Sequence, residues 1–328
     1  MTTAIAPAAS GYAPAPLRRG YQPPAGIRPR LKELHRSNTL RTIATALADH
    51  ALIAGSIAAT AVTATLSIPA AVAAALAAVL ISARSLRGLE NLLHEASHFN
   101  WANGSKARND RPALLLAAVP AGSPITGYRE SHYRHHQRFG TENDPDRRRY
   151  LELDLDHLDR SSTTAFLRGA LRRFPAYQAG WIASTGAHLP ALGGLLLYVG
   201  ALLGLGYALA GAVGAASAGV VLAAVYLVAL PLIRFTAEAS EHVYPGAESV
   251  FDATVSNLGP FQRLVLHPHG DGYHTVHHMW PSIPHFNTAR AHRLLMEADP
   301  DGYGARLRVR HRVLDNPVPH TGTAKENL

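Results

Sequence analysis

The chain has no cysteine among its 328 residues, and this absence narrows the chemistry that the protein can perform. Disulfides, zinc ribbons, iron–sulfur clusters and thiolate-ligated haem all require cysteine and are therefore excluded. The sequence also lacks a Gly-rich dinucleotide fingerprint and a fused haem domain. Any metal must be held by imidazole, carboxylate or amide groups, and any electrons must come from outside the chain.

Aromatic residues make up only 7% of the chain, and they do not alternate with basic residues as a nucleic-acid platform requires. The formal net charge of +8 is therefore not taken as a sign of nucleic-acid binding. The arginines instead cluster beside apolar stretches, which is how membrane proteins distribute positive charge. This pattern predicts an integral membrane protein.

Four apolar stretches approach or exceed the roughly 20 residues that a bilayer-spanning helix needs. We expect spans at about residues 42–66, 68–83, 181–210 and 215–233, arranged as two hairpins with uncharged tips. Positive charges flank the other ends of both hairpins, so the positive-inside rule places both termini and the central loop in the cytoplasm. No helix breaker except Gly88 lies between Ile81 and Asn91, so the second helix should extend above the bilayer.

The predicted fold class is therefore an all-α membrane protein, with four transmembrane helices in two hairpins and a cytoplasmic helical cap. The Pro- and Ala-rich residues 1–30 predict a tail that is disordered or draped over the rest of the protein. Residues 31–310 are expected to form the membrane domain, and residues 311–328 a flexible tail.

Histidine occurs in three boxes with helical spacing. They read His94-Glu-Ala-Ser-His98, His132-Tyr-Arg-His135-His136 and His274-Thr-Val-His277-His278. Residues three and four apart on a helix share a face, so each box directs two or three imidazoles the same way. Eight imidazoles exceed the about three that a catalytic zinc takes, so their number predicts two metal ions. All three boxes fall on the predicted cytoplasmic face, which places a His-rich di-metal site in the cap.

Further candidates surround the boxes. In Glu238-Ala-Ser-Glu241-His242, His242 is a candidate ninth imidazole, and Glu238, four residues earlier, is expected to lie one helical turn away. Glu238 is a candidate to bind the metal or hold a metal-bound water, and Glu241 is an equally placed competitor. Candidates to contact the ligands and fix their tautomers are Glu95, His269 and Asp271.

The boxes, in this order and with trailing prolines, resemble those of the membrane fatty acid desaturase family from about His94 to Pro284. The resemblance implies that the eight box histidines and His242 bind two non-haem irons. Glu238 stands where some members have an Asn that holds a water. The resemblance also implies that the protein uses O2 to remove hydrogen from an unactivated C–H bond of a lipid or acyl chain. The electrons would come from an external ferredoxin-like carrier and its reductase, for which the run Arg147-Arg148-Arg149 is a candidate docking surface.

Alternatives remain open. Lipid hydroxylases and ketolases carry similar boxes, so the product is not fixed by the ligand set. His94-Glu95-x-x-His98 also matches the zinc-peptidase pattern H-E-x-x-H, with Glu95 as general base, although a peptidase would leave two boxes without a role. A metal transporter would spread its ligands along a path through the membrane, whereas nearly all of these lie on one face.

Overall fold

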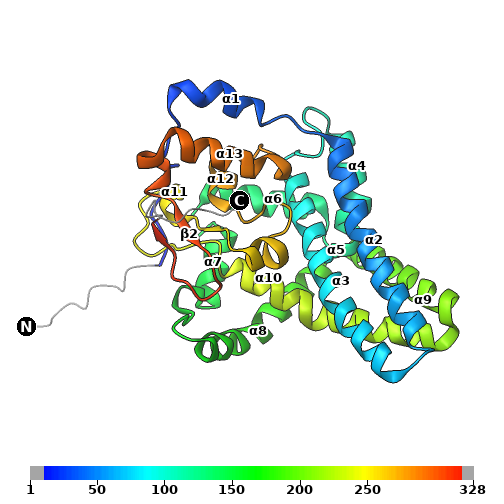
Figure 1. The fold of residues 1–328 in the computed structure, drawn as a ribbon. Helices are drawn as coiled ribbons and strands as arrows, with labels where there is room; N and C mark the ends of the chain where they lie inside the picture. The colour runs from blue at the N-terminus through cyan, green and yellow to red at the C-terminus, as the bar shows by residue number, and fades with distance from the viewer. Residues whose placement is uncertain (1–10, 320–328) are drawn as a thin grey trace, which may run out of the picture.

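The computed structural model describes residues 11–319, which form mainly helices (Figure 1). The helices are α1 (Arg28–Glu33), α2 (Thr39–Thr63), α3 (Ile68–Ser97), α4 (Lys106–Ala113), α5 (Val119–Ala121), α6 (Ile125–Arg138), α7 (Pro145–Glu152), α8 (Thr163–Gly186), α9 (Leu189–Ala224), α10 (Leu230–Glu238), α11 (Val250–Ala253), α12 (His274–Met279) and α13 (His285–Ala298). Short 3-10 or π segments are η1 (Ala25–Ile27), η2 (Leu114–Ala118), η3 (Leu155–His157), η4 (Val225–Ala229), η5 (Gln262–Leu266) and η6 (Pro300–Gly304).

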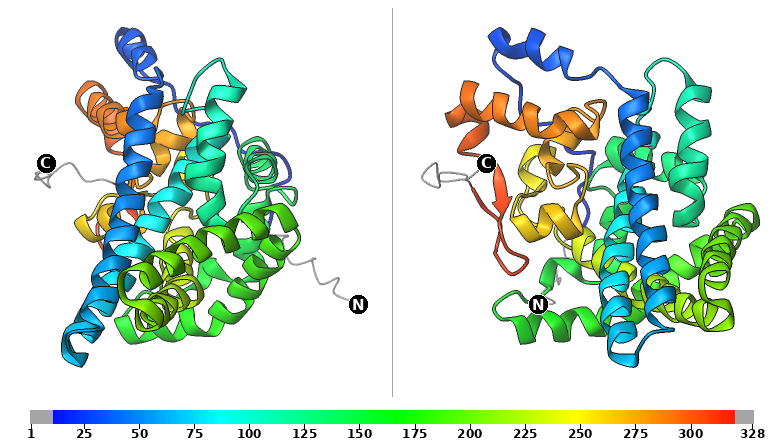
Figure 2. Two further views of the ribbon diagram at one scale, coloured as in Figure 1. Left: turned by 90° about the vertical axis from the view of Figure 1, so that its right-hand side faces the viewer. Right: turned by 45° about the vertical axis from the view of Figure 1, so that its right-hand side comes forward.

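Helices α2 and α3 form an antiparallel hairpin and lie side by side in both views of Figure 2. Asn38 caps α2 by accepting a hydrogen bond from the backbone N–H of Arg41 at 3.0 Å. Ser67 caps α3 in the same way, with the N–H of Ala70 at 3.3 Å. Helix α3 runs on to Ser97 without interruption, so it carries the first histidine box beyond its apolar part and into the cap.

Helix α9 breaks at Ala210 and Gly211, and Gly211 has a positive φ of 59°, which glycine adopts readily. A Cβ atom placed on Gly214 would lie 2.1 Å from the carbonyl oxygen of Gly206. In a straight helix, residues eight apart would be separated by about 12 Å. The chain therefore folds back on itself, and two glycines allow the two arms to touch. The predicted third span starts within α8, which contains Trp181, and α9 itself starts at Leu189.

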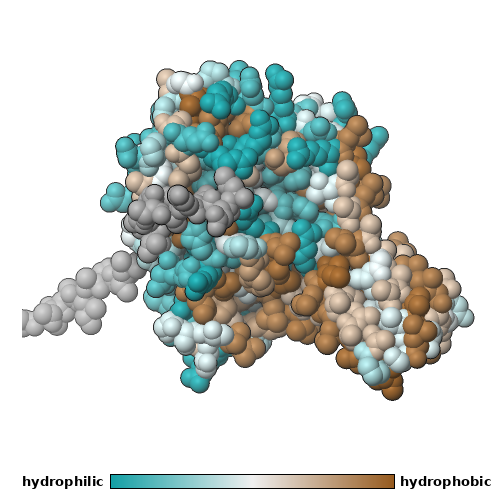
Figure 3. Space-filling model, viewed as in Figure 1, coloured by the Kyte–Doolittle hydropathy of each residue, from teal (hydrophilic) through white to brown (hydrophobic). Residues whose placement is uncertain are grey.

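Among the described residues, three helical stretches are long and apolar enough to cross a membrane: Thr39–Thr63, Ile68–Ser97 and Leu189–Glu238. Large apolar side chains on them point outward, including Leu80 at 69% exposure and Leu197 at 78%. In Figure 3 hydrophobic surface dominates the lobe at the lower right, while hydrophilic surface covers most of the cap. Apolar surface on this scale needs a partner, and these helices show that the chain associates with a membrane.

The described part of the N-terminal segment is draped over the cap and is not disordered. Residues 1–10 lie outside the described part, but residues 11–30 pack against the cap. The backbone N–H of Leu17 donates to the carbonyl of Phe139 at 3.2 Å, and the ring of Tyr21 lies 5.2 Å from that of Phe251. Tyr21 and Ile27 are both buried. A few separate apolar side chains between the prolines hold this segment on the cap. The average composition of the segment does not reveal such single contacts.

The cap also contains a small sheet, so the all-α prediction was wrong in this detail. Strand β1 (Ser256–Asn257) pairs in parallel with β2 (Arg308–Arg310), and β2 pairs antiparallel with β3 (Val318–Pro319). The predicted flexible tail over residues 311–328 therefore includes a strand. Residues 320–328 lie outside the described part.

Candidate metal centre

The three histidine boxes meet inside the cap although they lie far apart in the sequence. The first box ends α3, the second lies on α6, the third forms most of α12, and His242 follows α10. Trp280 ends α12, and Pro284 precedes α13, so the third box is held on a short helix between fixed turns. Seven of the nine side chains are buried and two are partly buried.

Five imidazoles converge in the first group, which consists of His94, His98, His132, His136 and His277. Nε2 of His94 lies 2.9 Å from Nε2 of both His132 and His277. Nε2 of His136 lies 3.0 Å from the same two atoms. The ring centroid of His98 lies 4.8 Å from that of His132, and its buried Nε2 has no hydrogen-bond partner among the described residues.

The other four imidazoles form the second group. Nε2 of His278 lies 3.1 Å from that of His274 and 3.4 Å from that of His135. Nε2 of His242 lies 3.2 Å from that of His274. The second and third boxes each supply ligand candidates to both groups, so neither group is complete without residues from several boxes.

These distances fit two bound metal ions. Two nitrogens bound to one ion at about 2.1 Å and at a right angle to each other are about 3.0 Å apart. A neutral imidazole has one N–H and one lone pair, so several Nε2 atoms in mutual contact cannot all be hydrogen-bonded to each other. Burial, reinforced by the neighbouring imidazoles, lowers the pKa well below its usual range for His98, His132, His136, His242, His274, His277 and His278. Neutral rings with converging lone pairs are what an imidazole-bound metal requires.

Two aspartates contact histidine rings at Nδ1, on the side opposite the converging Nε2 atoms. Nδ1 of His94 lies 3.3 Å from Oδ1 of Asp271, and Nδ1 of His135 lies 2.7 Å from Oδ1 of Asp144. Burial lowers the pKa of His135, but Asp146 and Asp144 outweigh this effect and raise the pKa to about 9. Carboxylates in this position fix the tautomer that turns Nε2 toward the metal.

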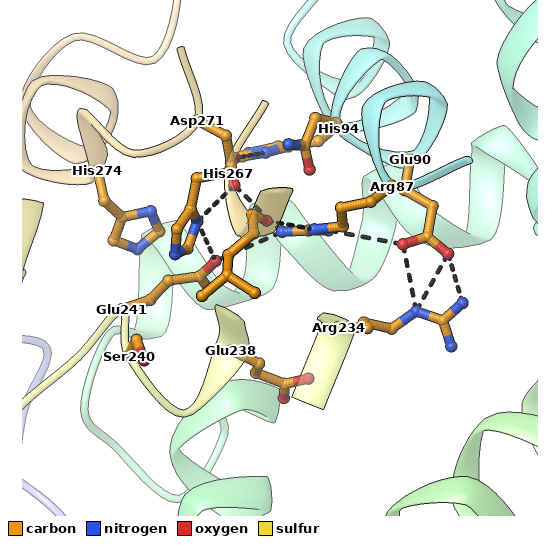
Figure 4. A network of polar contacts seen from close by, with 12 residues as sticks. Arg87, Glu90, His94, Arg234, Glu238, Ser240, Glu241, His267, Asp271 and His274 are labelled. Carbon is orange, nitrogen blue, oxygen red and sulfur yellow. Dashed lines mark hydrogen bonds and ion pairs between the residues drawn. The ribbon is translucent and has the colours of Figure 1, made fainter. Parts of the chain in front are cut away.

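A network of charged side chains lies beside both groups (Figure 4). Nη2 of Arg87 lies 3.1 Å from Asp271 and 3.7 Å from Glu241, while its Nη1 lies 3.6 Å from Glu90. Arg234 forms a close ion pair with the same Glu90. The sequence interpretation counted both arginines as part of the positive-inside bias, but the structure buries them among carboxylates.

Two members of this network titrate away from their usual ranges. Burial raises the pKa of Asp271, but hydrogen bonds with His267 and His94 outweigh it and hold the pKa well below its usual range. Burial, together with Asp271, raises the pKa of Glu241 to about 8. Asp271 is therefore the better stabilised of the two carboxylates.

The structure does not bring Glu238 into either group. Its Oε1 accepts a hydrogen bond from Arg149 at 2.8 Å, and its Oε2 accepts one from the hydroxyl of Tyr177 at 3.0 Å. Helix α10 ends at Glu238, so the expected helical spacing to His242 is wrong. Glu241 instead lies beside His242 and His274, with one ligand atom from each of the three within 4.8 Å of the others.

The remaining candidates differ in their contacts. Asp271 contacts a box histidine directly, as expected. Glu95 is buried and accepts hydrogen bonds from the backbone N–H of His285 at 2.7 Å and from Asn100 at 3.1 Å. This carboxylate is already bound by donors of the protein, which does not suit a general base acting on water. Nε2 of His269 lies 2.6 Å from Asp49 and does not face the two groups of imidazoles.

Asp144 contacts a candidate ligand, His135, and the sequence reasoning did not single it out. It was treated as part of a polar turn, but it caps α7 by accepting from the N–H of Asp146 at 2.9 Å and also contacts His135. The available signal was an Asp directly before Pro145, which is a helix-start pattern, placed shortly after a histidine box.

A groove of about 830 Å³ opens on the outer face between α2, α3 and η5. Its wall is mainly apolar, with Leu52, Leu80 and Leu264 exposed to the surroundings. Its polar end contains Asp49 and Arg84, which form an ion pair at 2.5 Å, and His269. His269 is two residues from Asp271, so the loop that lines the groove also supports the first group.

A comparison with known protein families identifies most of the chain. The family model described as Fatty acid desaturase matches residues 67–310, which include all nine histidines of the two groups. No curated protein matches the chain.

Proposed function

Because the chain belongs to the fatty acid desaturase family, we propose that it is an O2-dependent membrane desaturase acting on the acyl chain of a lipid. The observation that carries this proposal is the convergence of nine imidazoles into groups of five and four, with Nε2 separations of 2.9–3.4 Å. Two irons held there would supply the oxygen-activating chemistry that breaks an unactivated C–H bond.

The overall reaction converts –CH2–CH2– to –CH=CH– and reduces O2 to two waters, which consumes two electrons and two protons. The protein supplies ligands, orientation and a dry surrounding. The nine imidazoles would hold the two metals, while Asp271 and Asp144 contact the rings of His94 and His135 and would keep them oriented. Both rings are buried, which limits access of water to the site.

We further propose that the two arms of α9 and η4–α10 each cross the bilayer, which gives four spans with α2 and α3. Each arm is about 20 residues or longer, as a span requires. The charges flanking the hairpins support a cytoplasmic cap and cytoplasmic termini. The apolar groove between α2 and α3 would open toward the acyl layer, which suits entry of a lipid chain.

The external electron carrier needs a docking surface, and the predicted arginine run is a poor one. Arg147 is buried and forms an ion pair with Asp156, and Arg149 pairs with Glu238. A basic hollow of about 990 Å³ beside the third box is a better candidate, because Arg18, Arg28 and Lys32 are exposed around it. We propose that an acidic, ferredoxin-like carrier docks there.

The test is the fatty acid profile of a host membrane after expression of the full chain with a ferredoxin and its reductase. New unsaturated chains, detected by gas chromatography and mass spectrometry and lost in His277→Ala, are the expected result. His157→Ala is the matched control, because that histidine is exposed and lies outside both groups. Hydroxylated chains would identify a hydroxylase, and oxygen-independent peptide cleavage would support the peptidase pattern of the first box.

A further inference from the structure

The two groups of imidazoles are unequal, with five rings in the first and four in the second. On the basis of the proposed di-iron function, we infer that the carboxylate of Glu241 supplies an oxygen ligand to the metal of the second group. The residue at the position expected from the family pattern, Glu238, is turned away toward Arg149 and Tyr177.

The backbone places Glu241 at the second group. Helix α10 ends at Glu238, and the chain then turns so that His242 pairs with Thr254 in a β-bridge. The ligand atoms of Glu241, His242 and His274 all lie within 4.8 Å of one another. Atoms bound to one ion at about 2.1 Å are between about 3.0 and 4.2 Å apart. The limit of 4.8 Å lies just above this range, so the three side chains are close enough to approach one metal.

The Glu241 carboxylate also has no close hydrogen-bond donor in the described part of the chain. Its side chain is only 14% exposed, and its nearest cationic atoms are Nη2 of Arg87 at 3.7 Å and Nδ1 of His267 at 3.6 Å. Both separations exceed the range of a hydrogen bond. Glu238, by contrast, accepts two hydrogen bonds. A largely buried carboxylate without a close donor is costly, and a metal ion would compensate for that cost.

The charge balance of the network leads to the same residue. Its two guanidinium groups belong to Arg87 and Arg234, and its three carboxylates belong to Glu90, Asp271 and Glu241 (Figure 4). Arg234 pairs closely with Glu90, and Arg87 lies closer to Asp271 than to Glu241. Glu241 is thus the carboxylate of this network that has no closely paired arginine. The second group is built of imidazoles, which cannot offset the positive charge of a bound ion, so a carboxylate at its edge is complementary.

The experiment measures iron per chain and the ⁵⁷Fe Mössbauer spectrum of the detergent-purified full chain after exposure to a chelator. The wild type is expected to keep about two irons. Glu241→Gln is expected to bind one of them 10- to 100-fold more weakly, a typical loss for a changed metal environment, and to change one of the two iron signals. Glu241→Asp, which keeps the acid, is expected to retain more of the second iron than Glu241→Gln.

Glu90→Gln is the matched control, because it removes a carboxylate from the same network at a point remote from the second group. It should keep both irons, as should Glu238→Gln. If Glu241→Gln keeps both irons with unchanged signals, or if Glu90→Gln loses the same iron, the inference is overturned while the proposed function stands. A wild type that binds no iron overturns the proposed function and this inference with it. The melting temperature of the metal-free variants shows that each chain is folded.

Discussion

Asp144→Asn offers a sharp test of how the protein holds its histidines. Asp144 and His135 are both almost completely buried, and their contact is 2.7 Å long. Both carboxylate oxygens of Asp144 are in use, because Oδ2 accepts from the N–H of Gly140 at 2.8 Å and Oδ1 from that of Asp146 at 2.9 Å. An asparagine has only one acceptor oxygen, so its NH2 group must face one of these donors.

We expect Asp144→Asn to weaken metal binding in the second group by about 10- to 100-fold, which is about 1.4–2.8 kcal/mol. The first group should keep its iron, because none of its histidines contacts Asp144. The assay is iron content by elemental analysis after graded exposure to a chelator. About one iron per chain should be lost at a chelator concentration that leaves the wild type intact.

A stability measurement separates this effect from simple unfolding. Leaving a buried donor unpaired costs about 1–3 kcal/mol, so the metal-free variant should also melt earlier. Asp156→Asn is the matched control, since it breaks a buried ion pair with Arg147 away from both groups. It should lose stability but keep both irons. Equal chelator resistance of Asp144→Asn and the wild type would refute the reasoning.

Three further outcomes follow from the structure. Seven cluster histidines have pKa values lowered from 6.5, so the unfolded chain binds protons that the folded chain excludes. The free energy of unfolding of the metal-free protein should therefore fall as the pH drops below about 6.5, by up to about 1.4 kcal/mol per histidine and pH unit, and the melting temperature should fall with it. His135, with its pKa raised to about 9, adds stability that is fully present below about pH 6.5 and is lost only at higher pH, so it does not offset this fall. An unchanged melting temperature at pH 5.5 would contradict this account. Gly214→Val should destabilise the α9 hairpin by at least about 1–3 kcal/mol, because its Cβ would lie 2.1 Å from the Gly206 carbonyl oxygen. Gly204→Ala should not destabilise it, because a Cβ at Gly204 meets no atom within 4 Å. Thermal unfolding in detergent measures the difference. Arg28→Glu with Lys32→Glu should raise the carrier concentration needed for half-maximal turnover several-fold at low salt and leave iron content unchanged; an unaltered carrier dependence would exclude the basic hollow as docking surface.

The sequence predicted the parts of the fold and site that depend on local spacing. The family is confirmed, and the α2–α3 hairpin and the extension of α3 to His94 appear in the structure as expected. Box histidines three and four residues apart do share a direction, and the structure brings their Nε2 atoms together. Their role as iron ligands stays a prediction, and so do the four spans and the orientation in the membrane.

The features that the sequence did not predict depend on where elements end and on contacts between distant residues. The spacing from Glu238 to His242 looked helical, but α10 ends at Glu238, so Glu241 faces the site instead. The N-terminal segment has too few apolar residues for its own core, yet Tyr21 packs onto Phe251 from the other end of the chain. No periodicity within residues 11–30 reports such a contact.

The most direct test of the central claim is the metal content of the purified full chain, measured by elemental analysis beside His277→Ala. Nε2 of His277 contacts two other histidines of the first group, so this variant removes a shared ligand without changing the helix spacing. We predict about two irons per chain in the wild type and a loss of iron in the variant. One zinc per chain, retained in His277→Ala, would contradict the di-iron account and would favour a zinc peptidase with the H-E-x-x-H pattern of the first box.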